Sequence, residues 1–85
     1  MSNEYDSIIK ELEKEKSNGY TVFYPHQFVP YITIKELITN GYRCFLKQSV
    51  FGDDEVFITW DPNYKVGAFD YEYTIDMIDK YIGRR

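Results

Sequence analysis

The chain has little of what most catalytic and metal sites require. Among its 85 residues there is one cysteine, Cys44, and one histidine, His26. A single cysteine excludes an intramolecular disulfide, and one cysteine with one histidine is too few for a zinc site. A nucleophilic triad would need His26, which follows Pro25 in an expected loop rather than at a nucleophile elbow. We therefore expect a protein that is not an enzyme and that holds no metal and no cofactor.

Long apolar runs and clustered glycines are also missing. The five glycines are scattered, which excludes a glycine-rich phosphate loop. No apolar run approaches the ~18 residues of a membrane span. The N-terminus is polar and acidic, unlike the basic and then apolar start of a signal peptide. These features predict a cytoplasmic protein without membrane contact.

Charge is unevenly distributed along the chain, whose net charge is −4. Residues 1–49 contain six acids and six bases, whereas residues 50–79 contain eight acids against Lys65 alone, a local net charge of −7. Proteins that bind nucleic acid generally need lysine and arginine for the phosphates. The acidic block therefore argues against direct nucleic-acid binding and favours a protein partner.

The segment Asn-Gly-Tyr occurs twice, at residues 18–20 and 40–42. A helix commonly ends on a glycine in the left-handed conformation, and the apolar residue after it packs on the last turn. The alternative, a two-residue hairpin turn, is disfavoured because Ile8, Ile9 and Leu12 precede the first copy at helical spacing. Both copies are therefore interpreted as helix ends.

Three helices are expected. The first runs from a cap at Ser2 or Asn3 to about Lys16. The second begins at a capping box formed by Thr33 and Glu36, with Ile32 and Leu37 as a hydrophobic staple, and ends at Thr39; the alternative is an earlier start with Pro30 in its first turn. Thr74 caps the third, which continues through Tyr81 and ends by Gly83, with Ile75, Ile78 and Ile82 as its apolar stripe.

Strands are expected at residues 20–24, 43–50 and 55–60, and residues 51–54 form the turn of a hairpin between the last two. Residues 64–73 are either a fourth edge strand or an ordered loop. The long connection between the first two strands allows a parallel β-α-β crossover. We therefore predict a single α+β domain over residues 1–85. Its small mixed sheet has three or four strands packed by two or three helices, in the order α-β-α-β-β-(β)-α.

The two faces of the hairpin are not cleanly apolar and polar. Cys44 and Leu46 share one face, and Phe45 and Phe57 lie on the other. Cys44 is expected to be a small core residue rather than a reactive thiol. The face with Phe45 and Phe57 is expected to be covered by a helix or by a partner.

Acids alternate with aromatic residues from Phe69 to Asp79. If they face outward with the earlier acids, they form a negative surface with tyrosines beside it; otherwise the alternation simply buries the rings and solvates the acids. The candidate partner-binding residues are Asp53, Asp54, Glu55, Asp61, Asp70, Tyr71, Glu72, Tyr73, Asp76 and Asp79.

A family resemblance covers residues 30–62. With its short helix, the exit Gly41-Tyr42, a hairpin and the strand end Ile58-Thr59-Trp60-Asp61, this stretch resembles small uncharacterised proteins of bacteriophages and other large DNA viruses. The resemblance implies a compact accessory protein without chemistry of its own that binds a host or viral protein. It identifies no site residue.

Three classes of function remain open. The leading hypothesis is a non-enzymatic protein-binding module, of the viral accessory or inhibitor type, acting through the acidic, tyrosine-rich part of the chain. A specific version is an acidic nucleic-acid mimic that blocks a nucleic-acid enzyme. The second class is a minor virion or assembly component that self-associates through an open sheet edge or the Phe45/Phe57 face. The third is a metal-dependent enzyme using aspartate or glutamate.

Overall fold

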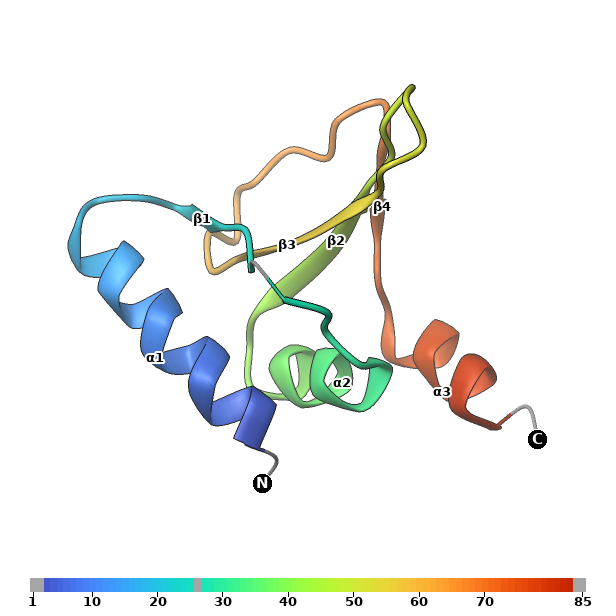
Figure 1. The fold of residues 1–85 in the computed structure, drawn as a ribbon, viewed down its shortest axis with the longest axis horizontal. Coiled ribbons are helices and arrows are strands. Elements are labelled where there is room, and N and C mark those ends of the chain that lie inside the picture. Colours follow the sequence, from blue (N-terminus) through green and yellow to red (C-terminus); the bar gives the residue numbers. More distant parts are fainter. Residues whose placement is uncertain (1–2, 26, 84–85) are drawn as a thin grey trace.

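The computed structural model describes residues 3–25 and 27–83, which form three helices and one four-stranded sheet (Figure 1). The elements are α1 (Asn3–Ser17), β1 (Val22–Phe23), α2 (Tyr31–Thr39), β2 (Arg43–Lys47), β3 (Glu55–Thr59), β4 (Asp70–Glu72) and α3 (Ile75–Gly83). The predicted α+β class and element order are confirmed. Ser2, the side chain of Asn3 and His26 lie outside the described residues.

Both Asn-Gly-Tyr segments end a helix, as predicted. At the end of α2, Gly41 has a φ of 97°, its N–H bonds Ile38 O at 3.1 Å, and the N–H of Tyr42 bonds Leu37 O at 3.0 Å. At the end of α1, Gly19 has a φ of 90° with the equivalent pair of bonds. This pattern is the Schellman motif, in which a left-handed glycine lets two backbone N–H groups satisfy the last carbonyls.

The predicted start of α2 is wrong in its preferred form. The helix begins at Tyr31, and Pro30 occupies the capping position without a side-chain cap; its carbonyl accepts the N–H groups of Thr33 and Ile34 at 3.0 Å each. Thr33 is therefore inside the first turn and fully buried, so it cannot form a capping box. Ile32 is 54% exposed, which also excludes the expected hydrophobic staple. The fixed φ of proline favours the earlier start, with Pro30 just before the first turn.

The cap of α3 is confirmed. The hydroxyl of Thr74 accepts the N–H of Met77 at 3.2 Å, and its carbonyl accepts the N–H of Ile78 at 3.1 Å. Ile78 is completely buried against the core, and Ile82 is partly buried against it.

The sheet is antiparallel throughout, with the strand order β1-β3-β2-β4. The predicted parallel pairing of the first two strands, and with it the mixed sheet, is therefore wrong. β1 and β2 do run in the same direction, but β3 lies between them. β3 thus has a hydrogen-bonded neighbour along both edges, and its residues Phe57, Ile58 and Thr59 are all buried.

Several strands are shorter than expected. β1 contains only Val22 and Phe23, whereas residues 20–24 were predicted. Pro25 follows closely and has no N–H to continue a ladder. β2 ends at Lys47 rather than near residue 50, and residues 64–73 contain both alternatives, a loop and then the short edge strand β4.

All three helices pack on one face of the sheet, here the inner face (Figure 1). Cys44 and Ile58 point into this core from the two central strands. Burial raises the pKa of the Cys44 thiol to about 12, so the thiol stays protonated at neutral pH. The prediction of a core cysteine is confirmed. The helical core residues are Tyr5, Ile8 and Leu12 of α1, Ile34 and Leu37 of α2, and Ile78 of α3.

The opposite, outer face is closed by the chain itself. The rings of Phe45 and Phe57 stack 5.0 Å apart, and both side chains are completely buried. Tyr64, from the loop between β3 and β4, lies 5.1 Å from Phe45 and 5.6 Å from Phe57, and Tyr24 lies 5.4 Å from Phe57. The expectation that a helix or a partner covers this face is wrong, because this loop and Tyr24 cover it.

We expect the substitution Gly41→Ala to lower the free energy of unfolding by about 1–2 kcal/mol, because alanine is strained in the left-handed conformation. Gly83→Ala is the matched control, since Gly83 has no left-handed φ and open space around its Cα. Urea unfolding monitored by circular dichroism measures both. Equal stability of the two variants would contradict the assigned helix end.

Candidate functional site: a tyrosine groove

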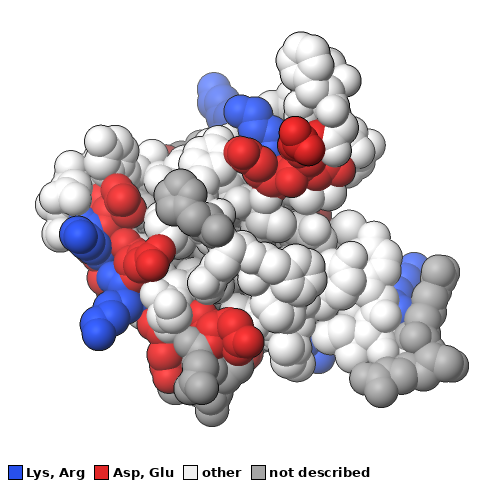
Figure 2. Space-filling model, in the orientation of Figure 1, with Lys and Arg blue, Asp and Glu red and all other residues white. Residues whose placement is uncertain are grey.

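The predicted acidic residues are spread over four places. Asp53, Asp54 and Glu55 lie at the tip of the β2–β3 hairpin, while Asp61 follows the other end of β3. Asp70 and Glu72 belong to β4, and Asp76 and Asp79 belong to α3. Glu55 and Asp61 lie at opposite ends of β3. The acids of β4 and those of α3 belong to two further elements, a strand and a helix. Figure 2 shows that red carboxylates gather beneath the hairpin tip and that an uncharged surface separates them from α3.

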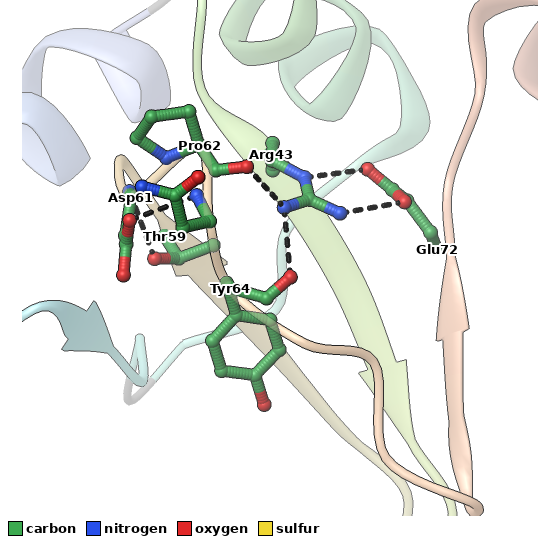
Figure 3. A network of polar contacts seen from close by, with 7 residues as sticks. Arg43, Thr59, Asp61, Pro62, Tyr64 and Glu72 are labelled. Carbon is green, nitrogen blue, oxygen red and sulfur yellow. Dashed lines mark hydrogen bonds and ion pairs between the residues drawn. The ribbon is translucent and has the colours of Figure 1, made fainter.

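Glu72 is held by an arginine (Figure 3). Nε of Arg43 donates to Glu72 Oε2 at 2.9 Å, and Nη2 donates to Oε1 at 3.0 Å, so the contact is bidentate. The hydrogen bond from Arg43 lowers the pKa of the Glu72 carboxyl and raises that of Arg43. The guanidinium also lies over the ring of Phe45, 5.1 Å from its centroid.

The same guanidinium anchors the loop that covers the outer face. Nη1 of Arg43 donates to the carbonyl oxygen of Tyr64 at 3.1 Å and approaches that of Pro62 at 3.5 Å (Figure 3). Arg43 thus connects β4, through Glu72, to the loop that carries Tyr64. The role of Glu72 in this structure is to position that loop.

Four further candidate acids also have partners within the chain. Asp61 Oδ1 accepts the N–H of Asn63 at 2.9 Å, and Asp54 Oδ1 accepts the N–H of Ser49 at 3.4 Å. Asp70 Oδ2 accepts the N–H of Gly67 at 3.0 Å and the hydroxyl of Tyr64 at 3.4 Å. Asp79 accepts Nζ of Lys35 at 2.6 Å, which links α3 to α2. Of the candidate acids, Asp53, Asp54 and Glu55 form neither of the two ion pairs found among the described residues.

A groove lies on the part of the inner face that the helices leave open. Its larger hollow, of about 770 Å³, and a smaller one, of about 350 Å³, share the lining residues Tyr31, Leu46 and Tyr73. We call the two hollows together the tyrosine groove. The larger hollow is also lined by Tyr24, Pro25, Phe28, Val56, Asp54 and Glu55, and the smaller one by Gln48, Tyr71, Met77 and Tyr81.

Strand register explains the course of the groove. Val56 of β3, Leu46 of β2 and Tyr71 of β4 form one row across the sheet. Residues opposite one another in antiparallel strands share a face. The row therefore forms a floor that runs across the strands, from the edge of β3 to β4.

The short first strand opens one end of the groove. β1 pairs only with Ile58 and Thr59, so it leaves the edge of β3 at Glu55 and Val56 uncovered. Gln27, Phe28 and Val29 also line the larger hollow, and α2 begins soon after them at Tyr31. The stop at Pro25 thus opens the end at which Asp54 and Glu55 lie.

Tyrosine rings form the wall at the other end. Tyr31 stacks on Tyr81, with centroids 5.0 Å apart, and meets Tyr73 edge to face at 6.4 Å. Burial raises the pKa of Tyr73, and the nearby Tyr31 adds to the effect. Tyr31, Tyr71 and Tyr81 remain 44%, 56% and 44% exposed. Aromatic side chains that are exposed and mutually supported in this way are suited to contact with a ligand.

The groove contains some of the predicted site residues and adds others. Tyr71, Tyr73, Asp54 and Glu55 line it, while Asp61, Asp70, Glu72, Asp76 and Asp79 do not, and Asp53 lies beside it in a neighbouring hollow with Glu55. The residues missed in the sequence are Tyr24, Phe28, Tyr31 and Tyr81. The available signal for three of them was their position at the two prolines: Tyr24 precedes Pro25, Phe28 lies between the prolines and Tyr31 follows Pro30, in a stretch too constrained to be a regular strand. Nothing in the sequence singled out Tyr81.

Comparison with known proteins assigns no family to this site. No protein-family model, no curated protein and no solved structure matches the chain. Within residues 3–25 and 27–83 there is no group of three or more metal-ligating side chains, and none of the helices there could cross a membrane. The functional argument therefore depends on the geometry of the groove.

We expect the Arg43–Glu72 contact to make stability depend on pH in the acid range. The pKa of Glu72 is depressed below its usual 4.5, so the contact contributes fully above that pH and is lost as the pH falls through the folded-state pKa. Between pH 7 and pH 3, the Glu72→Gln variant should therefore lose about 1 kcal/mol less of its unfolding free energy than the unchanged protein. Urea titrations at the two pH values measure this difference; identical losses would contradict the assigned contact.

Proposed function

We propose that this protein is a protein-binding module without chemistry of its own and that the tyrosine groove is its contact surface. The observation that carries the proposal is the pair of adjoining hollows whose walls are exposed tyrosines on an otherwise covered sheet. Contiguous exposed apolar surface on a small protein commonly marks an interaction site. Tyrosine is enriched at such sites because its ring is apolar and its hydroxyl accepts water or a partner.

The resemblance of residues 30–62 to small bacteriophage and viral proteins extends this proposal to an accessory or inhibitor protein that acts on a host protein. A shallow groove with an acidic end is consistent with that role, since an inhibitor needs a surface complementary to one target rather than catalytic groups.

The two other non-enzymatic hypotheses have less support. A nucleic-acid mimic needs free carboxylates in a continuous array, but Asp70, Glu72 and Asp79 have partners in the chain. Self-association through the Phe45/Phe57 face has less support, because those rings are completely buried and the protein's own loop packs on them. The edge of β4 remains open to pairing, although it is only three residues long.

The proposal predicts that the double variant Tyr71→Ala/Tyr81→Ala loses its partner while keeping its fold. Both side chains are well exposed, so their truncation removes contact area rather than core packing. The measurement is quantitative affinity capture from a bacterial lysate, with bound proteins identified by mass spectrometry and the fold checked by circular dichroism.

Tyr20→Ala is the matched control, because Tyr20 is 61% exposed but lines neither hollow of the groove. A protein retained by the unchanged chain and by Tyr20→Ala, but absent from the double variant, is the expected result. Equal recovery by all three would contradict the groove as the contact surface.

A further inference from the structure

The two ends of the tyrosine groove differ in chemistry. At the β3 edge, Asp54 and Glu55 line the larger hollow, and both residues are exposed. At the α3 end, the smaller hollow is lined by four tyrosines, Leu46, Met77 and Gln48. None of these side chains is a carboxylate. A ligand that fills both hollows therefore meets negative charge at one end and an aromatic pocket at the other.

No lysine or arginine among the described residues lines either hollow of the groove. Lys47 is opposite Glu55 in the ladder and lines the neighbouring hollow together with Glu55 and Asp53, but it forms neither of the ion pairs in the described part of the chain. With Asp53, Asp54 and Glu55 against this one lysine, this end of the groove keeps a net negative charge. A cation supplied by a ligand would find both carboxylates and tyrosine faces within one site.

The strand register sets the spacing between the two ends. Val56, Leu46 and Tyr71 lie on three neighbouring strands. Strands in a sheet are about 4.8 Å apart, so the β3 edge and the Tyr71 end of the groove are about 10 Å apart. An extended chain advances about 3.3 Å per residue, and three residues span that distance.

Resting on the proposed function, we infer that the ligand of the groove is an extended peptide segment with a lysine or arginine three residues away from an apolar or aromatic residue. The cation binds Asp54 and Glu55, and the apolar side chain fills the hollow between Tyr31, Tyr71 and Tyr81. Such a segment crosses the strands rather than adding to an edge, so side-chain contacts carry its recognition instead of backbone pairing.

The test uses a displayed library of random linear 12-residue peptides, selected on the full chain and counter-selected on Tyr71→Ala/Tyr81→Ala. Peptides that bind only the unchanged groove are then synthesised, and their affinities are measured by fluorescence polarisation. The inference predicts enrichment of a basic residue three positions from an apolar one, in either order along the peptide.

The variant Asp54→Asn/Glu55→Gln should weaken the binding of these peptides by about tenfold, since it removes two exposed ion-pair acceptors. Glu11→Gln/Glu13→Gln is the matched control with the same change of charge at exposed positions of α1, and it should leave the affinity unchanged. Replacing the basic residue of the peptide by glutamine should have the same effect as the acidic double variant.

The outcomes separate this inference from the proposed function. Peptides that depend on Tyr71 and Tyr81 but need no basic residue, or ignore Asp54→Asn/Glu55→Gln, would overturn the inference and leave the groove as a binding site. A selection in which no peptide distinguishes the unchanged chain from the tyrosine variant would overturn both.

Discussion

The contact on which the rest of the structure depends is that of Arg43 with Glu72 and with the loop between β3 and β4. The helices α1, α2 and α3 all pack on the inner face of the sheet, so no helix covers the outer face among the described residues. The outer face therefore depends on Tyr64, which packs on Phe45 and Phe57. Arg43 positions that loop by binding its carbonyl groups while its guanidinium lies over Phe45. A buried aromatic pair and a bidentate ion pair thus substitute for a second layer of helices.

This division of the two faces also locates the groove. Because the outer face is closed by the chain, the open apolar surface is the part of the inner face that extends past the helices toward the hairpin. Pro25 ends β1 early and leaves the β3 edge uncovered, and Pro30 fixes the start of α2 beside it. The same two prolines that interrupt regular structure therefore shape a surface where tyrosines are exposed together with Asp54 and Glu55.

Local signals in the sequence predicted local structure well. The helix ends at Gly19 and Gly41 needed no tertiary information, because a glycine that follows apolar residues at helical spacing is a local signal for a left-handed helix end. Strand neighbours were harder: β3 lies between β1 and β2, and its pairing with β1 joins Val22 to Thr59 and Phe23 to Ile58, residues far apart in the sequence. For the same reason, the sequence alone could not show which acids bind partners within the chain and which line the groove. Glu72 and Asp54 are both carboxylates in the acidic part of the sequence, but the side chain of Glu72 binds Arg43, whereas Asp54 lines the groove.

The most direct test of this account is an aromatic nuclear Overhauser spectrum of the isotope-labelled protein. It should contain cross-peaks from the ring of Tyr64 to those of Phe45 and Phe57, whose centroids lie 5.1 and 5.6 Å away. Cross-peaks between Tyr31 and Tyr81 should appear in the same spectrum, with centroids 5.0 Å apart. If Tyr64 showed no contact with either phenylalanine, the outer face would be the open apolar surface, and the account of the groove would be contradicted.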